Sequence, residues 1–297
     1  MPSRKSRLHS NKIRRKDELK NETTHQKHAV PKGIKDFLLG VIVTVASTYL
    51  LAFITDLLHP HYEIGDEIVF GKYEQDNNES NGAELIKWKV IAKQDNQYFL
   101  LSEKILDSCS YNVVDEDTSW ELCSLRKWLN EDFYNSAFSE SDKKKIVSVN
   151  NTNSSNDQYG TEGGNATLDH VFLLSVDEAE EYLSNDIAYG VCTDYAVERG
   201  AYTFEPYTDE DEHTYAVLKY SLSDPEDESR TIDIPFGITR ESFWLLRSPG
   251  RFQNLATRVF NTSYSKMFSP VGVCIDKDGI AVNADFMGLR PALWYKP

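Results

Sequence analysis

The side chains best suited to chemistry lie in the segment IDKDGIAVNADF, where carboxylate and amide oxygens alternate with apolar residues. Asp276, Asp278, Asn283 and Asp285, together with backbone carbonyls, offer the oxygen ligands that calcium takes in sets of about six to eight. Their spacing differs from that of an EF-hand loop, and Asp-Gly between alternating strands is also a strong hairpin signal. The segment therefore indicates either a calcium-binding site or an ordinary turn. No other cofactor is expected.

Two arginines stand inside apolar, tryptophan-bearing runs that are typical of strands. FWLLRSPG contains Trp244 and Arg247, and GLRPALW contains Arg290 and Trp294. Removing a guanidinium group from water is costly unless a partner accepts its hydrogen bonds. We therefore expect Arg247 and Arg290 to pair with buried carboxylates or strand-end carbonyls and, with Trp244, to hold a sheet together. If instead both pointed into an open pocket, they would be anion receptors.

The strongest catalytic signatures do not occur in the sequence. HExxH, GxSxG, GxxxxGK[ST] and GxGxxG are absent, and only four histidines follow the long apolar run of residues 37–58. A zinc site and a histidine-based triad therefore have no support, and no catalytic residue is assigned. The enzymatic alternative is a carboxylate-dependent hydrolase of the cell envelope, in which acids such as Asp276 and Asp285 work as a pair.

The four cysteines all follow the same apolar run, and no CxxC pair occurs among them. In an oxidising compartment they would allow disulfides, whereas a buried lone cysteine often behaves as a small hydrophobe. The pairing of Cys109, Cys123, Cys192 and Cys274 is therefore left open.

The first half of the domain that must position these residues shows both strand and helix patterns. Alternation of apolar and polar residues predicts antiparallel strands in DEIVFGKYEQ, ELIKWKVIAK and QYFLLSEKIL, joined by turns rich in Asn and Gly. Leucines at helical spacing after Thr118 and Glu121 predict a helix from about Ser119 to Asn130. Capping patterns at Ser139 and Ser175 predict two further helices.

The second half of the domain is predicted to be mainly strands. HVFLLS, FWLLRSPG, RVFNT, VGVCID, IAVNADF and GLRPALWY all have strand character, with DKDG as a turn. An acidic insertion at about 203–236 interrupts them, and we expect it to be solvated because like charges repel. The sequence thus predicts one α+β domain with antiparallel sheets and two principal helices.

Residues 37–58 form a run of twenty-two mostly apolar residues in which Asp56 is the first charged residue. At about 1.5 Å rise per residue they would span a hydrocarbon core of about 30 Å, so we interpret them as a transmembrane helix. A cleaved signal peptide is the alternative. Residues 1–36 carry eleven Lys/Arg against four Asp/Glu, whereas 21 basic and 42 acidic residues follow Leu58.

This asymmetry of charge predicts the topology. The positive-inside rule makes residues 1–36 a cytoplasmic tail and residues 59–297 an extracytoplasmic domain of a single-pass membrane protein. The tail lacks interleaved aromatic residues that would stack on bases, so we expect it to meet anionic lipid head groups rather than nucleic acid.

A series of motifs in fixed order resembles a family of bacterial extracytoplasmic domains of unknown function over most of residues 62–297. The motifs are FGKYEQ, IKWKVI, FLLSEKILD, SWELCSLRKWLN, FLLS with EAEEYL, FWLLRSPG and GLRPAL. The closing GLRP is also similar to the strand that ends formylglycine-generating enzymes, which implies a C-type-lectin-like fold. Those enzymes bind copper through two neighbouring cysteines, and here Cys274 stands without a second one nearby in sequence.

The resemblance therefore implies a binding or sensing domain more readily than a catalyst. We expect a membrane-anchored recognition module for an envelope glycan, peptide or protein partner. Under this hypothesis the oxygen-rich segment from Asp276 to Asp285 belongs to the binding surface.

Overall fold

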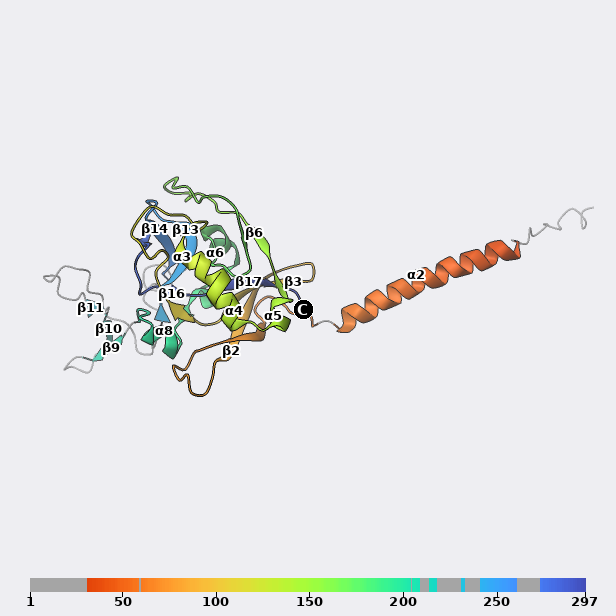
Figure 1. The fold of residues 1–297 in the computed structure, drawn as a ribbon, viewed down its shortest axis with the longest axis horizontal. Coiled ribbons are helices and arrows are strands. Elements are labelled where there is room, and N and C mark those ends of the chain that lie inside the picture. Colours follow the sequence, from red (N-terminus) through yellow and green to blue (C-terminus); the bar gives the residue numbers. More distant parts are fainter. Residues whose placement is uncertain are drawn as a thin grey trace, which may run out of the picture. The chain divides into compact units, whose positions relative to one another are not determined.

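The structure is a computed structural model that describes residues 31–58, 60–203, 205–208, 214–217, 231–232, 241–260 and 273–297 (Figure 1). The chain divides into two compact units, Met1–Pro60 and His61–Pro297. Most of the expected cytoplasmic tail, and most of the acidic insertion, lie outside the described residues.

The first unit contains helix α2 (Lys32–Leu58). It begins directly after Pro31, whose carbonyl accepts hydrogen bonds from the amides of Ile34 and Lys35. In the described part of the chain it is the one helix long and apolar enough to cross a membrane, with a mean hydropathy of 2.3 over Lys32–Ile54. An N-terminal helix of this kind is either a membrane anchor or a signal sequence.

The second unit is an α+β domain that contains two five-stranded sheets. The first sheet is antiparallel throughout, in the order β1 (Glu67–Tyr73), β2 (Glu84–Gln94), β3 (Gln97–Ser102), β17 (Ala292–Tyr295) and β5 (Ile146–Val147). Its first three strands are the predicted meander. The predicted α+β class with antiparallel sheets is therefore confirmed.

The second five-stranded sheet is built mostly from the later part of the chain. Its order is β15 (Ile275–Ala281), β14 (Leu255–Val259), β13 (Trp244–Pro249), β16 (Gly288–Leu289) and β4 (Asp107–Ser108). The pairing of β13 with β16 is parallel, whereas the other three pairings are antiparallel. FWLLRSPG thus forms the middle strand of this sheet, and all six residues of β13 are buried.

Three smaller sheets complete the strand pairing. They join β6 (Val149–Asn151) to β7 (Thr167–Asp169), β8 (Gly190–Val191) to β12 (Glu241–Ser242), and β10 (Thr214–Val217) to both β9 (Glu205–Thr208) and β11 (Thr231–Ile232). The last of these lies within the predicted insertion.

The motif GLRPALW passes from one large sheet to the other. Its first two residues form β16 in the second sheet, and residues 292–295 form β17 in the first. Arg290 and Pro291 lie between the two strands, where the Pro291 carbonyl accepts a hydrogen bond from the Ser102 amide at 2.9 Å. Arg290 is therefore placed where the chain changes sheets.

The principal helical segment is one continuous run of α3 (Ser124–Trp128), a π-helical turn η1 (Leu129–Phe133) and α4 (Tyr134–Ala137). The predicted start near Ser119 is wrong, because the Cys123 sulfur accepts the Arg126 amide and caps the helix there. Leu122 consequently lies outside the helix with 74% of its surface exposed.

The shorter helices agree more closely with their capping patterns. Ser139 and Ser175 each form a complete capping box, at the start of α5 (Glu140–Lys143) and α6 (Val176–Tyr182). Helices α7 (Asn185–Ala188) and α8 (Asp194–Glu198) were not predicted.

Two of the strand predictions are also corrected. HVFLLS does not form a strand, and Phe172 makes only an isolated antiparallel bridge to Ala292. DKDG does not form a hairpin turn, because β15 continues through it with an irregular register opposite Ala256 and Arg258. The positive φ of Gly279 accommodates this bulge.

The core of the domain is centred on three fully buried tryptophans, Trp88, Trp120 and Trp244. Each buried indole N–H has an acceptor. Trp88 donates to the Phe70 carbonyl and Trp244 to the Ala188 carbonyl, both at 3.0 Å, and Trp120 donates to a carboxylate described below. Each of these indole rings is therefore buried without leaving its N–H group unpaired.

Candidate functional site

The four residues of the predicted oxygen-rich site lie on β15 and in the segment that follows it. Asp276 and Asp278 lie on β15, whereas Asn283 and Asp285 are exposed in the segment after it. The Asp276 carboxylate accepts the Arg258 Nε at 2.9 Å and the Gly279 amide at 3.1 Å. Asp278 accepts the hydroxyl of Tyr159. The two strand carboxylates are thus engaged by neighbouring side chains and backbone.

Within the described ranges, one group of three acidic side chains places its oxygens within 4.8 Å of one another, and it lies elsewhere. Glu74, Asp76 and Glu84 meet at the loop between β1 and β2. Glu84 accepts the Gln75 amide at 2.7 Å, and Glu74 accepts the Asn78 amide at 2.8 Å. These carboxylates hold the backbone of a surface loop.

The Glu74 carboxyl group has a raised pKa. Its hydrogen bond from the Asn78 amide lowers the pKa, but desolvation and the neighbouring Asp76 and Glu84 carboxylates outweigh that bond. This loop is at the surface, where Asp76 is exposed and Glu74 and Glu84 are partly exposed.

Arg247 lies on β13 with 3% of its side chain exposed and forms a bidentate ion pair with Glu178 of α6. It also donates to the Leu173 carbonyl at 2.8 Å and to Asn153 Oδ1 at 3.3 Å. The guanidinium group therefore joins a strand, a helix and a loop, and it does not face an open pocket.

Arg290 is fully buried and is surrounded by backbone carbonyls. It donates to Ser102 from two nitrogens at 3.1 and 2.8 Å, to Ile187 at 2.6 Å, to Glu103 at 3.2 Å and to Tyr189 at 3.3 Å. Its guanidinium carbon lies 4.9 Å from the centre of the Trp244 ring. Burial lowers the pKa of Arg290 to about 9, which leaves the group charged at neutral pH.

A buried carboxylate also anchors the start of the principal helix. Asp169 has no exposed surface and accepts four hydrogen bonds, from Arg126, Trp120, Asn151 and Thr167, at 2.6 to 3.0 Å. Both oxygens of this buried carboxylate therefore accept hydrogen bonds from the protein itself.

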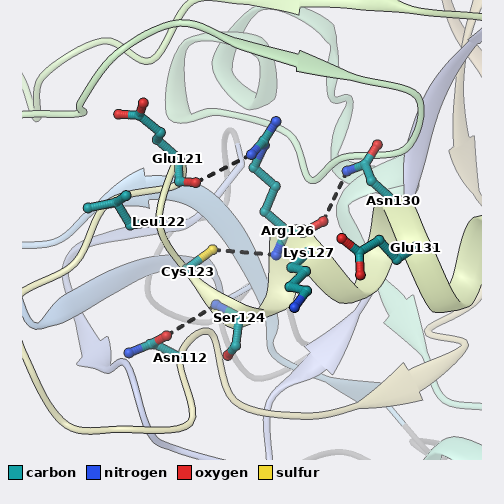
Figure 2. Close-up of a pocket in the computed structure, with 9 residues that line it drawn as sticks. All are labelled: Asn112, Glu121, Leu122, Cys123, Ser124, Arg126, Lys127, Asn130 and Glu131. Carbon is teal, nitrogen blue, oxygen red and sulfur yellow. Dashed lines mark hydrogen bonds between the residues drawn. The ribbon is translucent and has the colours of Figure 1, made fainter.

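A pocket of about 540 Å³ opens beside this anchored helix start. It is formed by the segment before α3, the first turns of the helical run, and one residue of the preceding loop (Figure 2). Its lining residues are Asn112, Glu121, Leu122, Cys123, Ser124, Arg126, Lys127, Asn130 and Glu131. The volume falls within the range of small-ligand sites, about 300–1,000 Å³.

Hydrogen bonds fix the wall of this pocket (Figure 2). Asn112 Oδ1 accepts the Ser124 amide at 3.1 Å, and Arg126 Nη1 donates to the Glu121 carbonyl at 3.3 Å. Asn130 Nδ2 donates to the Arg126 carbonyl at 3.0 Å and to the Val171 carbonyl at 2.9 Å. Arg126 itself is occupied by Asp169, so it supports the wall more than it offers charge to a ligand.

Lys127 and Glu131 supply the charges that the pocket presents to solvent. Both side chains are exposed, they stand one helical turn apart, and neither forms an ion pair within the described chain. Leu122 adds an exposed apolar side chain beside them. The pocket thus offers a cation, an anion and an apolar contact on a rigid wall.

The cysteines near this site are not activated. Burial raises the pKa of both the Cys123 and the Cys109 thiol to about 12, with Asp107 adding to the shift at Cys109. The four cysteines form no disulfide in the structure. At neutral pH the two thiols are protonated, and a protonated thiol is neither a nucleophile nor a metal ligand.

Sequence reasoning did not find this pocket. Lys127 lies on the predicted helix and Glu131 follows its expected end by one residue, and their i,i+4 spacing, which places them on one face of a helix, was the available signal. The contribution of Asn112 had no such signal, because it depends on a loop folding back onto the helix start.

These features define an α+β domain with a charged surface pocket. Residues 95–297 match the family described as Domain of unknown function (DUF6273), and the chain belongs to this family. Strands β1 and β2 precede the matched region. A search of the curated proteins and a search of the solved structures each find no match.

Proposed function

We propose that this protein is a membrane-anchored recognition module whose domain binds an envelope glycan, peptide or protein partner outside the cell. The pocket beside α3 carries the proposal. Its volume lies within the range of small-ligand sites. Its lining is mostly polar and charged, which suits a polar ligand.

The fixed wall of the pocket supports binding. Because Asn112, Arg126 and Asn130 hold the wall through hydrogen bonds, a ligand would order few side chains when it enters. Low ordering cost increases affinity for a given set of contacts. Lys127 and Glu131 would then set the selectivity for polar or charged ligands.

Helix α2 supports the membrane part of the proposal. Its cationic N-terminal flank and the acidic composition after Leu58 favour a single-pass topology with the N-terminus in the cytoplasm and the domain outside. We further propose that the domain is of bacterial origin and has a C-type-lectin-like arrangement, for which the motif series and the closing GLRP are the support.

The proposal is tested with the full chain in lipid nanodiscs, applied to glycan and peptide arrays. We expect at least one class of ligand to be retained. The double substitution Lys127→Gln with Glu131→Gln should weaken its binding by at least about tenfold, since the loss of even one hydrogen bond to a charged group costs about 1.5–3 kcal/mol.

Lys144→Gln is the matched control. Lys144 is an exposed lysine outside the pocket, and its replacement should leave binding unchanged. The proposal is overturned if the arrays retain no ligand, or if the pocket variant and the control bind a retained ligand equally well.

A further inference from the structure

Arg251 differs from the other arginines of the described domain. Five of the six donate hydrogen bonds from the guanidinium group to a carboxylate or to backbone carbonyls, namely Arg126, Arg199, Arg247, Arg258 and Arg290. Arg251 is exposed, and within the described chain its guanidinium group makes no hydrogen bond and no ion pair. Its donors are therefore available to a ligand.

Two aromatic rings nevertheless hold Arg251 in place. Its guanidinium carbon lies 5.5 Å from the centre of the Tyr159 ring and 5.4 Å from that of Phe252. Both distances are within the range of cation–π attraction. The position is thus defined by rings that leave the N–H groups free to bind an oxyanion.

The backbone around this side chain is also fixed. The Arg251 amide donates to the Asp278 carbonyl at 2.8 Å, and the Arg251 carbonyl accepts the Thr161 hydroxyl at 2.8 Å. Tyr159 is held by its hydrogen bond to the Asp278 carboxylate. Three segments far apart in sequence therefore meet at one surface position.

The neighbouring groups restrict the ligand. Phe252 exposes 59% of its surface and offers a flat apolar face, while the Asp278 carboxylate accepts hydrogen bonds and repels an isolated anion. The nearby Lys277 is neutralised by Asp157 and Glu180 at 2.9 and 2.7 Å. A ligand that suits all these groups carries an oxyanion, hydroxyl donors and a C–H face together.

We propose that Arg251, Tyr159, Phe252 and Asp278 form a binding site for an acidic saccharide, separate from the pocket beside α3. Arg251 pairs with the carboxylate or phosphate of the sugar, and its planar fork suits both. A neighbouring sugar hydroxyl donates to Asp278, and the sugar ring packs on Phe252. The site shares no residue with the pocket.

The test uses the full chain in nanodiscs and two acidic probes, each with its neutral parent. An oligogalacturonide is compared with its carboxyl-reduced form, and a phosphorylated mannose oligosaccharide with the unphosphorylated one. At least one acidic probe should bind more tightly than its parent. Arg251→Gln should weaken that binding about tenfold, and Arg251→Lys should restore it only in part because lysine lacks the fork.

Two controls separate this site from the pocket and from folding. Lys144→Gln removes the same charge elsewhere and should leave binding unchanged. Loss of acidic-probe binding in the Lys127→Gln, Glu131→Gln pocket variant, with binding retained by Arg251→Gln, would place the probe in the pocket and overturn the proposal. Arg251→Gln should lower the melting temperature only slightly, because the side chain supports no hydrogen bond and loses only exposed cation–π contacts. Equal binding of acidic and neutral probes, or full binding by Arg251→Gln, would overturn the proposal even if the pocket proposal stands.

Discussion

At the residue scale, Glu178 has two structural roles. Its carboxylate completes the capping box of α6 by accepting the Ser175 amide at 2.9 Å, and it forms the ion pair with Arg247 of β13. A single side chain therefore caps the start of one helix and fixes that helix against the middle strand of a sheet. This explains how an arginine can lie within an apolar strand.

Replacing Glu178 with Ala should destabilise the protein by about 3 kcal/mol or more, because the buried Arg247 cation would lose its partner. Urea unfolding of the detergent-solubilised chain, followed by tryptophan fluorescence, measures the loss. Glu180→Ala is the matched control on the same helix. Glu180 is 51% exposed and pairs with Lys277, so its loss should cost less than about 1 kcal/mol. Equal losses would contradict the assignment of Arg247 and Glu178 to the scaffold.

At the scale of elements, the bulge of β15 and the residue that follows β13 approach each other closely at two glycines, Gly279 and Gly250. Gly279 lies in the bulge of β15 with φ of +87°, and a Cβ there would lie 2.7 Å from the Ala256 carbonyl oxygen and 3.0 Å from Gly250 Cα. Such contacts involve backbone, which cannot move aside cheaply. The bulge therefore depends on the absence of a side chain at this position.

Gly279→Ala should consequently lower the free energy of unfolding by more than the strain of a positive φ alone would. Gly200 supplies the comparison, because its φ is +102° and a Cβ there would meet nothing within 4 Å. We expect Gly200→Ala to cost about 1–2 kcal/mol and Gly279→Ala at least about 2 kcal/mol more. Melting temperatures of the two variants check this difference, and similar shifts would show that the bulge relaxes.

The elements that could be predicted from sequence are those fixed by local interactions. Ser139 and Ser175 start their helices because capping boxes need only four residues. Thr118 and Glu121 have the same spacing but do not start a helix, since Asn112 and Asp169 position the chain so that Cys123 becomes the cap. HVFLLS has the local pattern of a strand, but only Phe172 pairs, with Ala292 more than a hundred residues away. The local pattern could not show that this pairing would stop at a single bridge.

The same distinction applies to the candidate sites. Arg247 and Arg290 drew notice because an arginine in an apolar strand is unusual, and their partners Glu178 and Ser102 became known only from the fold. Arg251 had no distinguishing pattern. What marks it in the structure is the contact of its guanidinium group with the Tyr159 ring, and Tyr159 lies ninety-two positions earlier in the chain, on a long loop.

At the scale of the whole molecule, helix α2 decides whether the domain stays attached to a membrane. A membrane anchor and a signal sequence share the same apolar composition, but they differ in what becomes of the chain after export. An anchor keeps residues 32–54 in the mature protein, whereas signal cleavage removes most of them.

We expect the mature chain to remain in membranes after an alkaline carbonate wash and to keep residues 32–54 when its mass is measured. Val43→Arg, near the middle of the apolar span, should reduce insertion because a charge there costs about 2.5–3.5 kcal/mol. Val43→Leu should not. A soluble mature chain that lacks these residues would show that α2 is a cleaved signal.

The position of β16 and β17 has a consequence for synthesis on the ribosome. Each lies inside a five-stranded sheet, β16 between β13 and β4, and β17 between β3 and β5. Neither sheet is complete until residues 288–295 have emerged from the ribosome. The strands that pair with β16 and β17 are made earlier, so their edges stay unpaired while most of the domain is translated. A newly made chain is therefore most exposed to aggregation just before its last strands appear, and chaperones would protect it best during that interval.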